Sequence, residues 1–381
     1  MGFLYFSSFN INLIEKGENL EEREKSEAIE REKGENLEER VKIDAIEDGE
    51  ERLKRVKIEA SEERVERDEF FSTGGRCVYR LMADTGLFKR DPVCILADPF
   101  LFKKSVEKSD EENSEKKGVE SSEKSTGKSE AEGEELFLFY EYQCKRYGRG
   151  ELRMRKTRDL VHWSEEWTVL REDFHLSFPN VFEDNGEYYM IPETGADGSI
   201  RLYKATDESL TNFRPYRTII KDGRKWADSD IVKKDGKYYL FTSIYSRKAP
   251  EARLFVADSL DGEFKEHPCS PYSTSPANAR NAGRIFEHEG KLFRPVQDNT
   301  KGYGKQLSIM EITALSPDSY SETLHREHIL DAGDKFYKRG GHQFCPITFA
   351  GRTIIATDGK QRNYNIRENI NGYCHHLCKR G

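Results

Sequence analysis

The 381-residue sequence predicts an all-β fold: a five-bladed β-propeller preceded by a charged N-terminal extension that is partly helical or disordered. Two observations predict the propeller. An apolar strand, a tight turn and a second strand rich in Tyr, Phe and Ile occur in this order five times. After the hairpins, an alternating strand runs into a polar turn and a shorter outer strand. Four antiparallel strands per repeat, at a period near 50 residues, are typical of propeller blades.

The five hairpins lie at similar intervals along the chain. Four of them are continuous, at residues 180–193, 230–243, 284–298 and 346–359. The first consists of residues 97–102 and 135–142, with a charged insertion in place of its turn. Asn185-Gly186 and Asp235-Gly236 are typical of hairpin turns, because glycine tolerates a positive φ. A β-sandwich does not explain the repeated order of these hairpins.

Two charged, low-complexity segments interrupt an otherwise ordinary composition. Residues 15–69 hold 22 acidic and 13 basic side chains, and residues 103–134 hold 10 and 7. The remaining sequence carries a net charge of about +4, although the whole chain has −8. We therefore divide the chain into an extension over residues 1–70, with internal repeats that could contact a protein partner, and a propeller over residues 71–381 with a disordered insertion at 103–134. A strand at Arg76–Met82 is expected to pair with the fifth hairpin and close the ring.

Composition and motifs exclude several classes of function. The sequence has no run of 18 or more apolar residues, so we expect no membrane-spanning segment. The start of the chain lacks the features of a signal peptide. Seven cysteines at irregular spacing indicate reduced thiols in a cytoplasmic protein. Basic residues are dispersed, which argues against nucleic acid. No nucleotide-binding loop or zinc-protease motif occurs, so we predict no cofactor and no metal site. Cys374 and Cys378, with two histidines between them, are the weak exception.

Propeller geometry predicts where a site would form. Residues just before the first strand and just after the second strand of each blade should converge at one end of the axis. They are, blade by blade, Asp98 with Glu141, Asn180 with Glu193, Asp228 with Ser243, Arg284 with Gln297 and Asp298, and His342 and Gln343 with Asp358. His175, just before the second blade, is expected at the same mouth.

These residue types favour glycoside chemistry. Clustered carboxylates shift one another's pKa values, so one can stay protonated while another is ionised. Glycoside cleavage needs that pair, one carboxyl as acid and one as base or nucleophile. Arg284 could bind a carboxylate or phosphate. The alternative interpretation is that these polar residues only form turns and strand ends, where Asp and Asn are common.

Several motifs resemble known carbohydrate-related propellers. The sequences ADPFLF (residues 97–102) and WADSDI (residues 226–231) resemble glycoside hydrolase families 43, 32 and 68. The segments HLSFPNVFEDNGEYYMIPE (residues 175–193) and ARNAGRIF (residues 279–286) more closely resemble the N-terminal propeller domain of glucosamine inositolphosphorylceramide transferases. In the plant transferases, glucosamine transfer is attributed to a separate C-terminal domain. The resemblance, which covers roughly residues 91–359, therefore implies the propeller and not that activity.

The resemblance also implies roles for individual residues. By the hydrolase pattern, Asp98 would be the base or nucleophile, Asp228 a carboxylate that tunes the pKa values, and Glu193 the best candidate for the acid. The sequence departs from the closer family at Cys345, where an Asp before Pro346 would be expected. We predict a propeller that binds or processes a glycan or glycoconjugate at its axial pocket, by hydrolysis or transfer if it is an enzyme. The alternative is a non-catalytic sugar-binding or protein-interaction scaffold.

Overall fold

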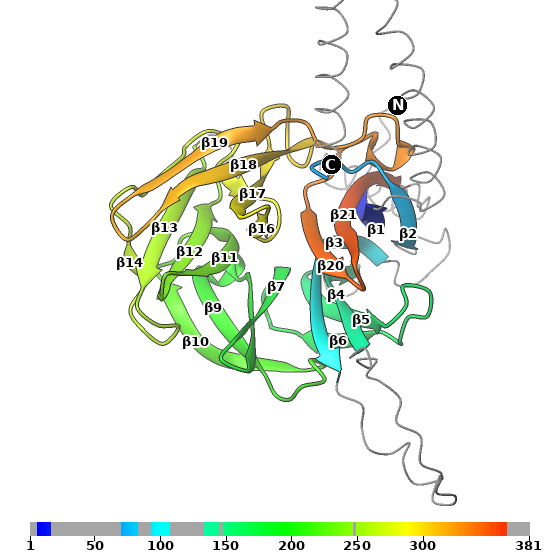
Figure 1. Cartoon of the computed structure of the whole chain (residues 1–381), viewed down its shortest axis with the longest axis horizontal. Coiled ribbons are helices and arrows are strands. Elements are labelled where there is room, and N and C mark those ends of the chain that lie inside the picture. The colour runs from blue at the N-terminus through cyan, green and yellow to red at the C-terminus, as the bar shows by residue number, and fades with distance from the viewer. Residues whose placement is uncertain are drawn as a thin grey trace, which may run out of the picture.

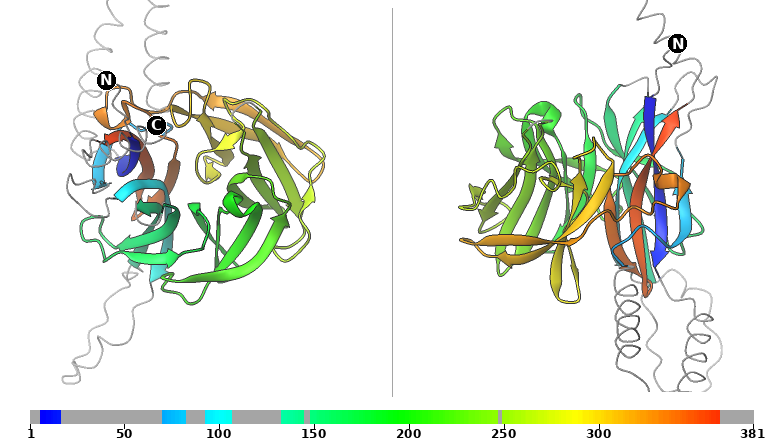
Figure 2. Two further views of the ribbon diagram at one scale, coloured as in Figure 1. Left: turned by 180° about the vertical axis from the view of Figure 1, so that it is seen from behind. Right: turned by 90° about the horizontal axis from the view of Figure 1, so that it is seen from above.

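The computed structural model describes residues 6–16, 70–82, 93–106, 133–144, 148–246 and 249–363, and these form five antiparallel sheets. The sheets surround a common centre, as Figure 1 shows, and stand side by side like blades in the two views of Figure 2. The predicted all-β, five-bladed propeller is therefore confirmed. Within the described ranges, no helix is long and apolar enough to cross a membrane.

The first three sheets run in sequence order from the axis outward. Sheet one comprises β3 (Val93–Val106), β4 (Gly133–Cys144), β5 (Gly150–Thr157) and β6 (Trp167–Leu170). Sheet two comprises β7 (Ser177–Asp184), β8 (Glu187–Glu193), β9 (Ser199–Ala205) and β10 (Phe213–Lys221). Sheet three comprises β11 (Trp226–Lys234), β12 (Lys237–Ile244), β13 (Glu251–Ala257) and β14 (Lys265–Glu266).

The last two sheets depart from this simple order. In sheet four the innermost strand is split into β15 (Arg280–Asn281) and β16 (Phe286–His288), followed by β17 (Lys291–Asp298), β18 (Gln306–Leu315) and β19 (Tyr320–Arg326). Sheet five has the order β20 (Phe344–Phe349), β21 (Arg352–Asn363), β1 (Phe6–Lys16) and β2 (Arg76–Leu81). Two short 3₁₀ helices, η2 (Gly195–Asp197) and η3 (Lys335–Tyr337), lie in connections.

The fifth sheet closes the ring with two strands from the beginning of the chain. β1 pairs along its whole length with β21, from Phe6 opposite Asn363 to Lys16 opposite Thr353. The strand expected at Arg76–Met82 does lie in this sheet, but it pairs with β1 and not with the fifth hairpin. β1 was not predicted, and it places part of the expected extension inside the propeller. The physical reason is the burial of Ile11 and Leu13, whose side chains lie fully inside the core. A solvated extension would leave these apolar side chains in water.

The charged segments lie mostly outside the described residues. β3 and β4 are longer than the two strands predicted for the first hairpin. Lys103 pairs with Leu136, and Val106 pairs with Gly133. The insertion expected at 103–134 is therefore shorter at both ends, and residues 107–132 lie outside the described ranges. The same holds for residues 17–69, which contain most of the internal repeats, and for Cys374 and Cys378.

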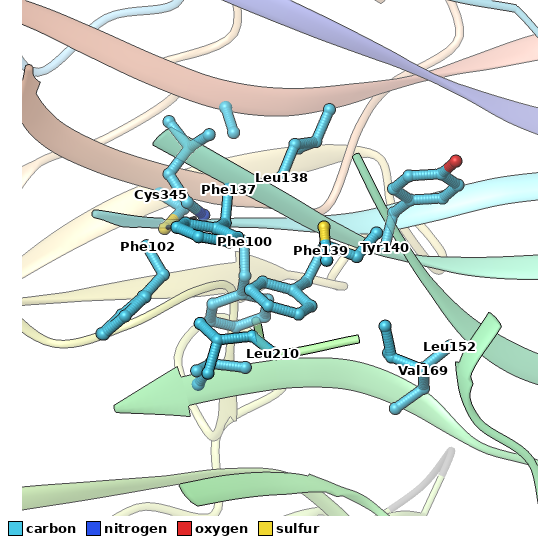
Figure 3. Packing of buried hydrophobic residues seen from close by; sticks show 14 of the residues in the cluster. Phe100, Phe102, Phe137, Leu138, Phe139, Tyr140, Leu152, Val169, Leu210 and Cys345 are labelled. Carbon is cyan, nitrogen blue, oxygen red and sulfur yellow. Dashed lines mark hydrogen bonds between the residues drawn. The ribbon is translucent and has the colours of Figure 1, made fainter. Parts of the chain in front are cut away.

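The largest apolar core lies around the first blade, where aromatic side chains fill the space between neighbouring sheets. Figure 3 shows Phe100, Phe137 and Phe139 of this blade beside Leu210 and Cys345 from the blades on either side. Phe100 also meets Phe178 edge to face, with ring centroids 4.7 Å apart. Because aromatic contacts of this kind join adjacent blades, they fix the positions of the axial strand ends that carry the polar groups.

Candidate functional site at the propeller axis

A bulge recurs at the start of the first strand in three blades. The ladder register shifts between Ala97 and Phe100 in β3, and at the corresponding points of β7 and β11. The residues in these bulges, Asp98, Phe178 and Asp228, have φ values of 50°, 52° and 50°. Non-glycine residues rarely adopt this left-handed conformation, so packing and hydrogen bonds must hold it in place. Such bulges often redirect a side chain at functional sites.

Five carboxyl groups meet at this end of the axis, two of them from bulges, and we call this group the acid layer: Asp98, Glu141, Glu193, Asp228 and Asp358. All five were singled out from the sequence. Burial raises the pKa of Glu141 well above its ordinary value, and the charges of the other four acids raise it further. The predicted convergence of acids from several blades is therefore seen in the structure. Their catalytic role stays a prediction.

Asp98 lies at the centre of this layer and is almost fully buried. Its Oδ2 accepts a hydrogen bond from the backbone N–H of Phe178 at 3.1 Å, and its Oδ1 lies 3.5 Å from Nε2 of His342. Burial is the main cause that raises the pKa of Asp98 to about 6, with the Asp228 and Asp358 charges adding to it and His342 opposing. At neutral pH the carboxylate is mostly ionised, yet close enough to its pKa to take up a proton.

His342 connects Asp98 with Asp358. Nδ1 of His342 lies 2.5 Å from Oδ2 of Asp358, whose Oδ1 accepts the backbone N–H groups of His342 and Gln343 at 2.7 and 3.2 Å. Burial disfavours the imidazolium, but the two carboxylates outweigh it and raise the pKa of His342. Asp98, His342 and Asp358 each offer a ligand atom within 4.8 Å of the others, so these three buried residues are a group, among those that the structure describes, that could hold a metal ion.

Arg280 neutralises the other half of the acid layer, and it was missed in the sequence. Its guanidinium pairs with Asp228 through Nε, and its Nη2 lies 3.3 Å from Oε2 of Glu193. Nε2 of Gln297 donates to the same Asp228 carboxylate at 3.1 Å. Burial, reinforced by the charge of Asp228, raises the pKa of Glu193 well above its usual range despite Arg280. Burial thus favours the protonated form of the Glu193 carboxyl.

His175 reaches the same end of the axis beside Glu141. Its Nδ1 accepts the backbone N–H of Gly150 at 2.8 Å, and its Nε2 lies 3.6 Å from Oε1 of Glu141. Burial lowers the pKa of His175, so the ring is neutral at pH 7 and carries its proton on Nε2. In the described part of the chain Oε1 of Glu141 is buried without a hydrogen-bond partner. This oxygen is therefore an unsatisfied acceptor within the acid layer.

Asn180 and Arg284 lie apart from the acid layer, with Asp230, in a second polar group that we call the axial floor. Nδ2 of Asn180 donates to Oδ1 of Asp230 at 2.5 Å, and Nε of Arg284 donates to Oδ1 of Asn180 at 3.1 Å. The other guanidinium nitrogens of Arg284 donate to the carbonyls of Leu101 and Val181. All three nitrogens of the Arg284 guanidinium therefore donate to groups of the protein itself. The structure places neither Asn180 nor Arg284 at the expected ligand-binding position.

The bulge explains this displacement. Asn180 and Asp230 are each two residues beyond the bulge residue of their blade, and Phe178 occupies the position in blade two that Asp98 and Asp228 occupy in theirs. A bulge leaves no signal in the alternation of polar and apolar residues. The sequence therefore could not show whether the bulge residue or the residue two positions later faces the acid layer.

The remaining predicted residues are placed as follows. Asp298 caps a turn by accepting from the backbone and hydroxyl of Thr300 at 2.9 and 2.6 Å, so it lies outside the acid layer. Gln343 is buried, and its Nε2 is 3.5 Å from the carbonyl of Pro99. The hydroxyl of Ser243 donates to the carbonyl of Ala279 at 2.9 Å.

A cavity of about 520 Å³ opens beside Glu193 and Arg280, and we call it the rim pocket. Its lining residues are Glu193, Gly195, Ala196, Asp197, Gly198, Gly223, Lys225, Trp226, Tyr245, Arg280 and Tyr303. Tyr245 and Tyr303 are 40% and 42% exposed, so both rings are accessible to a ligand. Exposed aromatic rings beside buried carboxyl groups are suited to a sugar, whose ring packs on the aromatic face while its hydroxyls meet polar groups.

Fold and site define this protein as a carbohydrate-related five-bladed propeller. The chain belongs to the family described as glucosamine inositolphosphorylceramide transferase 1, N-terminal, whose profile matches residues 129–336. Glucosamine inositolphosphorylceramide transferase 1 of Oryza sativa subsp. japonica and that of Arabidopsis thaliana are each 33% identical over 198 residues. Each match covers 50% of this chain but 26% of the relative, so it spans about a quarter of those proteins.

Solved structures with a similar arrangement include two glycosidases. Zg3597, a family 117 glycoside hydrolase of Zobellia galactanivorans, has a TM-score of 0.44 and 14% identity over 70% of this chain and 84% of its own. An α-L-arabinofuranosidase of Podospora anserina has a TM-score of 0.43 and 11% identity over 58% and 86%.

Proposed function

We propose that the rim pocket and the acid layer bind a glycan or glycoconjugate and process it by glycoside hydrolysis or transfer. One observation carries this proposal. Glu193, a carboxyl whose pKa burial raises well above the usual range, lines an open pocket beside the acid layer, in which Asp98 ionises near pH 6. Two carboxyl groups held in different protonation states are what glycoside chemistry needs.

The proposed roles follow from these protonation states. Glu193 is the acid that protonates the departing glycosidic oxygen, because burial raises its pKa well above the usual range and so favours its protonated form. Asp98 is the base or nucleophile, since it is mostly ionised there. Asp228 tunes both, because its charge raises the pKa values of Asp98 and Glu193 while Arg280 partly offsets it. The relatives' name, glucosamine inositolphosphorylceramide transferase 1, supports a glycoconjugate as the ligand.

Turnover of a panel of aryl glycosides, including glucosaminides, tests the proposal. We expect the wild type to cleave at least one of them, and Glu193→Gln and Asp98→Asn to lower kcat about 100-fold or more while binding remains measurable. Glu187→Gln, an exposed carboxyl at the opposite end of β8 from Glu193, is the matched control and should leave turnover unchanged. A wild type that binds no glycan at all would contradict the proposal.

The second candidate is a non-catalytic glycan-binding module. It is favoured by the contacts that already occupy both aspartates: Asp98 accepts the Phe178 amide, and Asp228 pairs with Arg280 and Gln297. The same panel separates the candidates. Saturable binding by the wild type without turnover of any glycoside supports the module and rejects the enzyme.

A further inference from the structure

The rim pocket has a wall of backbone between blades two and three. A Cβ on Gly198 would lie 2.6 Å from the Cα of Gly223, and one on Gly195 would lie 2.1 Å from the carbonyl oxygen of Trp226. Side chains are therefore excluded at Gly195 and Gly198, and the two connections approach backbone to backbone. This wall is preformed, which suits a pocket that holds a ligand without rearrangement.

The charges around this pocket differ in sign from those of the adjacent acid layer. Asp197 is neutralised twice, by Arg201 and by Lys221, whose Nζ lies 2.7 Å from Oδ2. The carboxyl of Glu193 faces the Arg280 guanidinium, with Oε2 3.3 Å from Nη2, and burial raises its pKa. Asp197 and Glu193 therefore leave no uncompensated negative charge on the lining.

Two lining residues supply unused cationic donors. Lys225 is exposed and has no ion pair or side-chain hydrogen bond with any residue that the structure describes. Arg280 donates through Nε and Nη2 to Asp228 and Glu193, but its Nη1 has no acceptor in the same ranges. Lys225, Arg280 and the two cations beside Asp197 outnumber the carboxyl groups that pair with them, those of Asp197, Asp228 and Glu193, so the pocket has a net positive character that attracts an anion.

The aromatic rings stand beside the same guanidinium. Cζ of Arg280 is 5.5 Å from the ring centroid of Tyr245 and 5.2 Å from that of Tyr303. Both rings line the pocket and are accessible. A ligand that meets Arg280 from the pocket thus lies next to two aromatic faces, which bind the apolar face of a sugar ring.

We propose that the rim pocket recognises a phosphate-bearing sugar, with its ring against Tyr245 or Tyr303 and its phosphate against Lys225 and Arg280. This inference rests on the proposed function and names its ligand class. A phosphate carries close to two negative charges at neutral pH and three acceptor oxygens, which match two separate cationic groups better than a single carboxylate does.

Calorimetric titration of the full chain with four probes tests this inference: glucose 1-phosphate, glucuronate, methyl glucoside and inorganic phosphate. We expect glucose 1-phosphate to bind most tightly, and its affinity to fall with increasing salt. Lys225→Ala should weaken it about tenfold and leave methyl glucoside unchanged. Lys265→Ala, an exposed lysine of β14 in the third blade, is the matched control and should change neither.

The other outcomes overturn the inference in distinguishable ways. Equal affinity for methyl glucoside and glucose 1-phosphate rejects the phosphate and leaves the proposed glycan site standing. Tighter binding of glucuronate rejects phosphate in favour of a carboxylate. Inorganic phosphate that binds as tightly as the sugar phosphate rejects the contribution of the ring. A preference for phosphate that survives Lys225→Ala rejects this pocket, and failure of all sugars to bind rejects the proposed function as well.

Discussion

The acid layer and the axial floor are both polar groups buried at the propeller axis, yet their hydrogen bonding differs. In the floor, Asp230 accepts from Asn180 and from the backbone N–H of Ile285, and Arg284 donates to an amide and two carbonyls. In the acid layer, carboxylates outnumber cations, and buried side-chain oxygens of Glu141 and Gln297 have no partner within the described residues. Burial alone therefore does not mark a functional group. An excess of like charges does.

Backbone strain also distinguishes the acid layer from the axial floor. Asp98 and Asp228 hold φ near 50°, whereas Asn180, Asp230 and Arg284 are not among the residues with positive φ. Left-handed conformations at such residues cost about 1–3 kcal/mol each. This cost falls on two residues of the acid layer, which is typical of sites kept for function, while the floor stabilises the fold.

The largest expected effect is in the floor. Asp230→Ala leaves the Ile285 amide and the Asn180 side chain buried without an acceptor, and we expect it to lower the free energy of unfolding by about 3–5 kcal/mol. Chemical denaturation measures this loss. Asp258→Ala, an exposed carboxyl, is the control and should cost less than about 0.5 kcal/mol. A loss for Asp230→Ala no larger than that of the control would contradict the structural role of the floor.

Asp98→Asn should have the next largest effect, seen in the pH dependence of stability. The folded-state pKa of Asp98 is about 6 against an ordinary value of 3.8, so the unfolded chain releases this proton first. Stability of the wild type therefore falls as pH rises from about 4 to 6, and this contribution is at most about 3 kcal/mol.

The asparagine variant cannot ionise and should lack that decline, which denaturation at pH 4, 5, 6 and 7 measures. Relative to the wild type, it should gain stability as pH rises. Parallel profiles for the two proteins would show that folding does not raise the pKa of Asp98, and the contrast with the floor would fail.

The smallest effect is expected at the rim pocket. Tyr245→Ala removes one exposed ring and should weaken glycan affinity about fivefold, equivalent to about 1 kcal/mol. Its thermal midpoint should stay near that of the wild type, because the ring is 40% exposed. Tyr216→Ala on β10, with a similarly exposed ring outside the pocket, should leave affinity unchanged. If Tyr216→Ala weakens binding as much as Tyr245→Ala does, the aromatic surface is not specific to the rim pocket.

Much of the site could be predicted because propeller geometry repeats. The spacing of the hairpins placed Asp98, Glu141, Glu193, Asp228 and Asp358 at one end of the axis, and the structure brings them together. That inference needed only the direction of each strand and the position where it begins or ends.

Two parts could not be predicted for definite physical reasons. Arg280 and Arg284 lie four residues apart in one motif, and only the path of the split first strand of blade four directs Arg280 to the acids and Arg284 to the floor. β1 was missed because its pairing partner, β21, is more than 300 residues away, and a local pattern does not record such pairing.

The sequence by itself determined the repeat, the hairpin turns and the composition of the axial groups, because turn chemistry and alternation are local properties. Tertiary structure alone decided which strands close the ring, which arginine meets the acids and which carboxyl groups have raised pKa values. The physical reason is that burial and the distances between charges, which set the pKa values of Asp98 and Glu193, exist only after the five blades have packed around one axis.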